Sequence, residues 1–300
     1  MSLTSLLKTN SDMKELFKTI PNLKSLIRVE SGEPVDLKSI DIKNTLLSKN
    51  PSLIGHAYDY FLQLFCLRIN NAADAYDYML ETLFDFPEID QDVFSDNAWS
   101  YIKGFGAWNE DLTRQSIVCG KLDQYHRSRI IPENILDIEQ IDIDDLNNLI
   151  IMTLNHENIF KSEERFISNP TFGADISFLV GGADGDLIIN KTLIDIKVNS
   201  KIHYESYPWH QLIGYYLLSQ LTPNIDYSID RLAIWNPRYE IFMYICIHDL
   251  NTKVDIKSFC YQFIKLLNSI HKNGLQNSLI AKKIISIESI WNNKRKLDLE

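Results

Sequence analysis

The chain has 300 residues, with 30 Lys and Arg against 40 Asp and Glu, so its formal net charge is −10. Apolar residues make up 45% and charged residues 23%, which is ordinary for a globular protein and excludes a disordered, collagen-like or coiled-coil chain. The charge excludes a uniformly basic coat for nucleic acid, but it allows a local basic groove and suits a cluster of metal-binding carboxylates.

The cysteines and the hydropathy pattern favour a cytoplasmic protein. Cys66, Cys119, Cys246 and Cys260 show none of the C-x-x-C spacings of zinc or iron–sulfur sites, so we expect reduced thiols. No apolar run approaches the roughly 18 residues of a membrane-spanning helix. Residues 1–20 are typical of a polar amphipathic segment and not of a signal peptide.

Helical patterns dominate the first part of the chain. Residues 1–50 carry short helical patterns broken by Pro21 and by the Ser31–Pro34 turn. A strong pattern covers 53–69, with Ser52 as the expected N-cap. Further helices are expected at 71–84, 109–128 and 142–160.

Strand patterns begin after Pro170. Strands are expected at 175–180, 184–190, 192–199, 227–236 and 239–247. Helices are expected at 209–220, at 256–272 behind an Asp255 N-cap, and at 277–293. This order predicts an α+β (mixed α/β) fold with a small mixed central sheet flanked by helices. We expect a helical region over 1–50, a core over 51–250 with a helical insertion at about 71–168, and C-terminal helices over 251–300 that pack on the core.

A β-hairpin with its tight turn at Asn190-Lys191 is the most informative local feature. With Ile189 facing Thr192, Asp186 falls opposite Asp195, and Asp184 falls opposite Lys197. Directly opposed residues share a face, so three carboxylates and one ammonium converge on one patch. The intervening residues Ile194, Ile196 and Val198 then point to the core.

Opposed carboxylates repel one another unless a cation neutralises them. A hard divalent cation with oxygen ligands does this well, and it can activate water and stabilise charge on a phosphate. A lysine beside a ligand acid can position that water. The plain alternative is a solvated hairpin face with one salt bridge.

Two patterns together resemble a known group. Asp186, an apolar strand, a turn and a second strand ending in Asp195-Ile196-Lys197 resemble the PD-(D/E)XK nuclease superfamily. Gln211 and Tyr215, four residues apart on one helix face, resemble the Q-x-x-x-Y motif of its RecB-like branch. The resemblance covers the helix at 53–69 and residues 170–247, and it implies a restriction-endonuclease-like core.

The resemblance also implies roles for individual residues. Asp186, Asp195 and the Ile196 carbonyl would bind one or two Mg²⁺ or Mn²⁺ ions, and Asp59 on the first helix would contribute a further carboxylate. Lys197 would orient or help to deprotonate the attacking water. Catalytic Gln211, together with Tyr215 and Lys201, would position the substrate. The substrate would be nucleic acid, DNA rather than RNA, with antiviral defence or DNA repair as the setting and the helical insertion as substrate channel or partner surface.

Departures from the pattern leave alternatives open. Gly185 stands where the superfamily has its proline, and Asp184 competes with Asp186 for the first ligand position. We favour Asp186, because it opens the apolar strand. Asp59 is equally explained as a surface acid, and neighbouring His56 is better explained as a satisfied polar side chain than as a ligand. An inactive nuclease-like module that binds nucleic acid or protein, and a hydrolase of small phosphate esters, are the competing hypotheses. A protein partner and homo-oligomerisation stay open.

Overall fold

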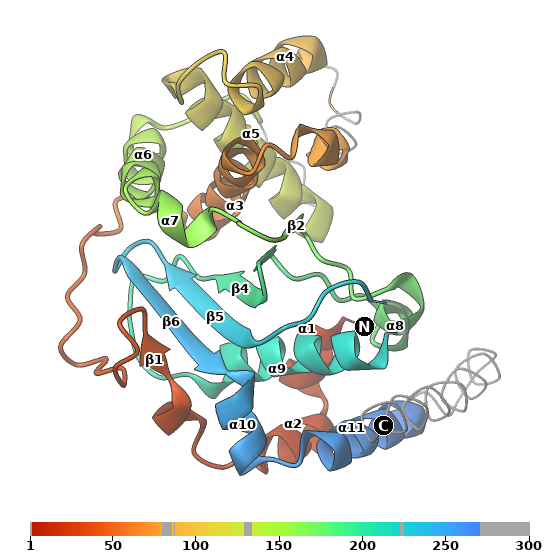
Figure 1. Ribbon diagram of the computed structural model, residues 1–300. Coiled ribbons are helices and arrows are strands. Elements are labelled where there is room, and N and C mark those ends of the chain that lie inside the picture. The colour runs from red at the N-terminus through yellow and green to blue at the C-terminus, as the bar shows by residue number, and fades with distance from the viewer. Residues whose placement is uncertain (1, 80–85, 87, 129–133, 223–224, 271–300) are drawn as a thin grey trace.

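The computed structural model describes residues 2–79, 86, 88–128, 134–222 and 225–270 (Figure 1). A six-stranded mixed sheet lies between two groups of helices, which confirms the α+β class and the flanked central sheet. No helix within the described ranges combines the length and the apolar character that a bilayer crossing needs. The helix expected at 277–293 lies outside the described residues.

The sheet has the order β1-β6-β5-β4-β3-β2. Among the strands that the structure describes, only β4 and β5 pair in parallel, and helix α9 makes the crossover between them. All other neighbours are antiparallel. The strands are β1 (Arg28–Val29), β2 (Phe166–Ser168), β3 (Leu187–Ile189), β4 (Thr192–Ile196), β5 (Arg231–Asn236) and β6 (Ile241–Cys246).

Helix α3 and the helical insertion that follows it cover one face of the sheet (Figure 1). Its core joins apolar side chains of α3, α5 and α6 to Ile194, Ile196 and Trp235 of the sheet, and Val198 packs against it, as the alternation predicts. This layer contains α3 (Pro51–Ile69), the 3-10 segment η2 (Ala73–Met79), α4 (Gln91–Ile102), α5 (Glu110–Ser128), α6 (Gln140–Leu154) and α7 (Glu157–Phe160).

The opposite face is covered by α8 and α9 together with helices from both ends of the described chain (Figure 1). Phe17 of α2 meets the rings of Phe259 and Phe263 of α11 at 5.2 and 6.0 Å between centroids. Edge-to-face ring contacts of this kind add stability beyond area burial. This layer contains α1 (Leu3–Thr9), α2 (Ser11–Lys18), the 3-10 turn η1 (Leu23–Leu26), α8 (Ala174–Leu179), α9 (Ser206–Leu221), α10 (Ile247–Lys253) and α11 (Ile256–Ile270).

Two local predictions are wrong. Residues 175–180 lie in and just after helix α8 instead of forming a strand. The buried positions Ile176, Leu179 and Val180 have helical spacing. An apolar run this short fits the period of a helix as well as that of a strand.

The N-cap of α3 is Asn50 and not Ser52, because Asn50 Oδ1 accepts the Leu53 N–H at 3.1 Å and Pro51 takes the first helical position.

The hairpin turn forms as predicted, with Ile189 paired to Thr192. Asn190 adopts a left-handed backbone conformation with φ of 55°, which asparagine tolerates better than most residues. Its side-chain oxygen accepts hydrogen bonds from Ser162 Oγ, Glu163 N and Glu164 N at 2.9, 3.1 and 2.9 Å. The turn is therefore fixed to the segment that leaves the helical insertion.

Helices α3 and α5 cross so closely that Gly120 has no room for a side chain. A Cβ at Gly120 would lie 2.9 Å from Ala57 N and 3.1 Å from Leu53 O, which are backbone atoms of α3. We expect Gly120→Ala to lower the free energy of unfolding by about 1–3 kcal/mol, because the backbone cannot yield as a side chain would. Chemical denaturation followed by circular dichroism measures this loss.

Gly55→Ala in α3 is the matched control. No heavy atom lies within 4 Å of a Cβ at this position. This substitution should raise stability by up to about 1 kcal/mol through helix propensity. Equal effects of the two substitutions would contradict a close α3–α5 crossing.

Candidate functional site

Asp186 and Asp195 meet at the open end of the hairpin. The pairing of Leu187 with Ile194 makes them the next opposed pair. Asp186 Oδ2 accepts the Ile196 N–H at 2.6 Å, so it reaches across to β4. Asp195 is only 3% exposed. Asp184, in contrast, is exposed to solvent before the strand begins.

Lys197 neutralises Asp195 in the structure. Lys197 Nζ lies 2.6 Å from Asp195 Oδ2 in an ion pair, and the lysine side chain is 26% exposed. Burial opposes the ammonium charge, but the carboxylates of Asp195, Asp186 and Asp59 outweigh it and raise the pKa of Lys197. Asp195 Oδ2 receives no well-aligned hydrogen bond from the described residues. The negative charge of this buried oxygen is therefore balanced mainly by the ion pair with Lys197.

Asp59 lies on α3, which packs on the sheet from the other layer, and its carboxyl interacts electrostatically with the same charges. Burial raises the pKa of its carboxyl well above the ordinary range, and the negative charge of Asp186 raises it further. Lys197 lowers this pKa and Asp195 raises it again, so Asp59 interacts with both hairpin residues. We call Asp59, Asp186, Asp195 and Lys197 the carboxylate–lysine cluster.

The raised pKa of Asp59 makes stability depend on pH. Native Asp59 keeps its proton to a higher pH than in the unfolded chain, so native protein binds more protons between the ordinary and the raised pKa. Stability must then fall as pH rises through that window. Asp59→Asn cannot ionise, so without metal we expect it to be more stable than wild type above the window.

Denaturation between pH 4 and pH 8 in EDTA tests this expectation. The advantage of Asp59→Asn should shrink as pH falls and vanish near the ordinary carboxyl pKa of about 4. Asp41→Asn, which removes an exposed carboxylate elsewhere, controls for the change in net charge. A constant difference between Asp59→Asn and wild type at every pH would contradict the raised pKa.

Gln211 and Tyr215 lie on α9 as the motif spacing predicts. Gln211 Nε2 donates to Tyr215 Oη at 2.9 Å and to Thr4 Oγ1 at 3.5 Å. Burial raises the pKa of Tyr215 to about 12, and Asp195 and Asp186 contribute to the increase. Both side chains are nearly buried beside the cluster, where they join α9 to α1.

Helix α1 reaches this site because Gly214 leaves space for it. A Cβ at Gly214 would lie 2.9 Å from Leu3 Cδ2. Leu3 N also donates to the Gly182 carbonyl at 3.1 Å, on the approach to the hairpin. Tyr207 Oη donates to the Thr4 carbonyl at 3.3 Å. Helix α1 is thus held against both α9 and the loop before β3.

Sequence reasoning missed the contribution of α1 and of Asp123. His56 Nδ1 lies 2.7 Å from an Asp123 carboxylate oxygen, and the Asp123 charge also raises the pKa of Asp59. Lys8 Nζ lies 4.8 Å from the centre of the Tyr207 ring. These contacts join segments far apart along the chain, so no local sequence signal could have found them.

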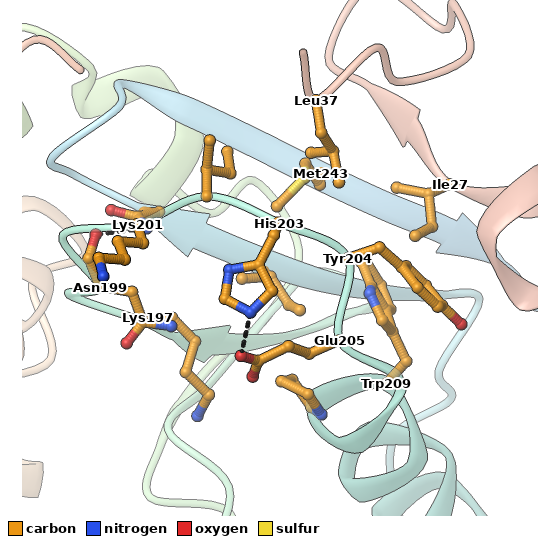
Figure 2. Close-up of a pocket in the computed structure, with 14 residues that line it drawn as sticks. Ile27, Leu37, Lys197, Asn199, Lys201, His203, Tyr204, Glu205, Trp209 and Met243 are labelled. Atoms are coloured by element: carbon orange, nitrogen blue, oxygen red, sulfur yellow. Dashed lines mark hydrogen bonds and ion pairs between the residues drawn. The ribbon is translucent and has the colours of Figure 1, made fainter. Parts of the chain in front are cut away.

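Lys201 does not join the carboxylate–lysine cluster directly. It is exposed and lines a cleft next to the cluster, on the loop that follows β4 (Figure 2). Lys197 lines the same cleft, so the predicted substrate contact and the predicted catalytic lysine border one space. His203 Nε2 and Glu205 Oε1 form an ion pair of 2.6 Å at its rim.

The donor chemistry of the cluster fits a hard divalent cation. Asp59, Asp186 and Asp195 supply oxygen ligands, and their mutual repulsion is what such a cation relieves. Among the residues that the structure describes, no three His, Cys, Asp or Glu side chains already form a metal-coordinating group. Lys197 holds Asp195 instead, so binding of a cation would require Asp195 to exchange this ion pair for a metal contact.

Comparisons with protein-family models, with curated proteins and with solved structures find no match to this chain.

Proposed function

We propose that this chain is a metal-dependent nuclease of the PD-(D/E)XK type that hydrolyses phosphodiester bonds in DNA. One observation carries the proposal: Asp59 from α3 interacts with Asp186, Lys197 and Asp195 of the hairpin. The charges of three carboxylates and one ammonium from two distant parts of the chain thus influence one another, and Asp195 and Lys197 form an ion pair of 2.6 Å. Such groupings of perturbed ionisable residues concentrate at functional sites.

The carboxylates of Asp59, Asp186 and Asp195, with the Ile196 carbonyl, would hold Mg²⁺ or Mn²⁺. A bound ion of this kind polarises phosphoryl oxygens and makes its bound water more acidic. The chain itself keeps Asp195 3% exposed, which strengthens electrostatic interactions there. The Asp186 carboxylate is aligned on the Ile196 N–H, so the hairpin fixes its direction.

In the metal-free geometry, Lys197 would act as a hydrogen-bond donor that orients the attacking water. Its raised pKa keeps it protonated at neutral pH, so its N–H groups can align a water or stabilise negative charge on phosphorus. Removal of a proton from water by Lys197 would need a lower pKa. Neutralisation of Asp195 and Asp186 by a cation acts in that direction, because these carboxylates raise the pKa of Lys197.

The hydrolysis of nucleic acids tests the proposal. Wild type should cleave plasmid, linear duplex or single-stranded DNA with Mg²⁺ or Mn²⁺, and EDTA should stop cleavage. Asp186→Asn and Asp195→Asn should each lose activity. The matched control is Asp184→Asn, an exposed carboxylate next to the same strand, which should keep activity.

Each alternative has its own outcome in the same assay. Cleavage of RNA alone would replace DNA as the substrate. Hydrolysis of small phosphate esters without any cleavage of nucleic acid would identify a small-ester hydrolase. Failure to bind Mn²⁺ together with no cleavage would leave an inactive module that binds nucleic acid or protein.

The cytoplasm, with its reduced thiols and free Mg²⁺, is the location that suits the proposed activity.

A further inference from the structure

Thr4 of α1 joins the hydrogen-bonded pair that Gln211 and Tyr215 form on α9. Gln211 Nε2 donates to Tyr215 Oη at 2.9 Å and to Thr4 Oγ1 at 3.5 Å. Burial raises the pKa of Tyr215, and its hydrogen bonds with Gln211 and Thr4 oppose this increase. The three side chains are therefore connected to one another, and we call them the Thr4–Gln211–Tyr215 triangle.

The two contacts of Nε2 determine how the Gln211 amide lies. A side-chain amide has two N–H donors on its nitrogen and one oxygen acceptor. The two donors match the two hydroxyl oxygens of Thr4 and Tyr215. The oxygen, Oε1, accepts no hydrogen bond from the part of the chain that the structure describes. It is therefore the atom of this amide that can accept a hydrogen bond from water.

The position of Thr4 does not depend on its own hydroxyl. Leu3 is completely buried, and its Cδ2 fills the space that a Cβ at Gly214 would need. The Thr4 carbonyl also accepts a hydrogen bond from Tyr207 Oη at 3.3 Å. Helix α1 should therefore stay docked when Thr4 becomes valine, which has the same branched shape but no hydroxyl.

The triangle lies within electrostatic reach of the carboxylate–lysine cluster. Burial is the largest cause of the raised pKa of Tyr215, and the charges of Asp195 and Asp186 raise this pKa further. The Gln211 amide thus lies on the side of α9 that faces the proposed metal ligands. In phosphoryl-transfer sites, a glutamine side chain can orient the attacking water.

We propose that Thr4 is a positioning residue of the nuclease site, whose hydroxyl holds the Gln211 amide so that Oε1 is available to the attacking water. The inference rests on the proposed function for the reaction that Gln211 serves. It assigns part of the site to a residue 207 positions before Gln211 in the chain. Without the Thr4 hydroxyl the amide keeps one contact and can rotate, so bound substrate should react more slowly.

Substitution at Thr4 tests this role in the cleavage reaction. Thr4→Val should reduce single-turnover cleavage of saturating DNA with Mn²⁺ by about tenfold to a hundredfold, because a small misplacement of a positioning group costs this much. The DNA concentration that gives half the maximal rate should change by less than about twofold, since contacts with bound substrate remain. Full activity of folded Thr4→Val would overturn the proposal.

Two matched variants distinguish the hydroxyl from the fold. Thr4→Ser keeps the hydroxyl and should cleave within about twofold of wild type. Thr9→Val makes the same chemical change at an exposed position of α1 and should leave the rate unchanged. Loss of activity in Thr4→Ser equal to that in Thr4→Val would contradict a role for the hydroxyl. If Thr4→Val does not fold, Thr4→Ala replaces it with the same expectations.

A double variant tests whether Thr4 acts through Gln211. In protein that already carries Gln211→Met, the further change Thr4→Val should alter the cleavage rate by less than about twofold, because the group that Thr4 orients is gone. Effects of the two substitutions that multiply would show that Thr4 acts independently of Gln211, and they would overturn the proposal.

Hydrogen exchange of the Gln211 side chain gives a readout that does not depend on cleavage. NMR of isotope-labelled protein identifies this amide by its absence in Gln211→Met. Its protons should exchange with solvent at least about tenfold faster in Thr4→Val than in wild type or Thr4→Ser, because hydrogen bonds protect against exchange. Faster exchange with no cleavage by wild type would refute the nuclease and keep the orienting contact. Cleavage by wild type with equal exchange rates would do the reverse.

Discussion

Lys197→Met is expected to reduce the rate of DNA cleavage by about 10²–10³-fold, the usual cost of removing a preorganised donor from a charged transition state. Methionine keeps much of the apolar stem of lysine but cannot donate a hydrogen bond. The carboxylates remain, so Mn²⁺ binding should be retained. Single-turnover cleavage with saturating Mn²⁺ measures the effect.

The same variant carries a second readout that does not depend on activity. Without metal, Lys197→Met leaves the 3% exposed Asp195 carboxylate without its ion pair, so the protein should be less stable in EDTA than wild type. Added Mn²⁺ compensates this charge. The rise in melting temperature on adding Mn²⁺ should therefore be larger for Lys197→Met than for wild type.

Lys191→Met is the control, because it removes an exposed lysine from the turn of the same hairpin. It should leave both cleavage and the Mn²⁺-induced shift unchanged. Full activity of Lys197→Met would refute its catalytic role. An unchanged Mn²⁺ shift in Lys197→Met would show that the cation does not reach Asp195.

Arg238→Met is expected to lower the free energy of unfolding by about 3–5 kcal/mol, because it leaves a buried carboxylate unpaired. Arg238 and Asp145 are both completely buried and form a two-pronged ion pair of 2.8 and 3.0 Å. Asp145 Oδ2 also accepts the Ser48 N–H at 3.1 Å. The pair thus ties the β5–β6 turn to α6 and to the segment before α3.

A double substitution separates the cost of an unpaired charge from the value of the pair. Arg238→Met with Asp145→Leu removes both charges, so it should recover much of the stability that Arg238→Met loses. Urea unfolding of wild type, both single variants and the double variant completes the cycle. A double variant less stable than either single variant would show that the pair itself is strongly stabilising.

The hairpin was predictable because its information is local. Asn190 and Lys191 define the turn, and the register then places Asp186 opposite Asp195 and Lys197 on the face of Asp195. Alternation predicts that Ile194 and Ile196 enter the opposite core, as observed. Helix N-caps with a single candidate in the sequence, such as Asp255, were also predictable. The Asp255 side chain accepts the Lys257 and Ser258 N–H groups, as a cap does.

Other features depend on contacts that sequence does not reveal. Strand β2 is three residues long and exists through its pairing with β3. Residues 175–180 have too few positions to distinguish strand from helix, so their tertiary packing decides. The approach of Asp59 to the hairpin follows from the packing of α3 on α5 and on the sheet, which no local pattern specifies. The cleft at Lys197 likewise needs walls from distant segments.

The docking of α1 has a consequence for synthesis on the ribosome. Leu3, Leu6 and Leu7 are buried, and Leu3 packs against Gly214 and donates to Gly182. At about 5–20 residues per second, Gly214 follows Leu3 out of the ribosome by roughly 10–40 s. During that interval the leucines of α1 have no native partner on α9. Helix α1 can therefore take its native position against α9 only after Gly214 has been translated.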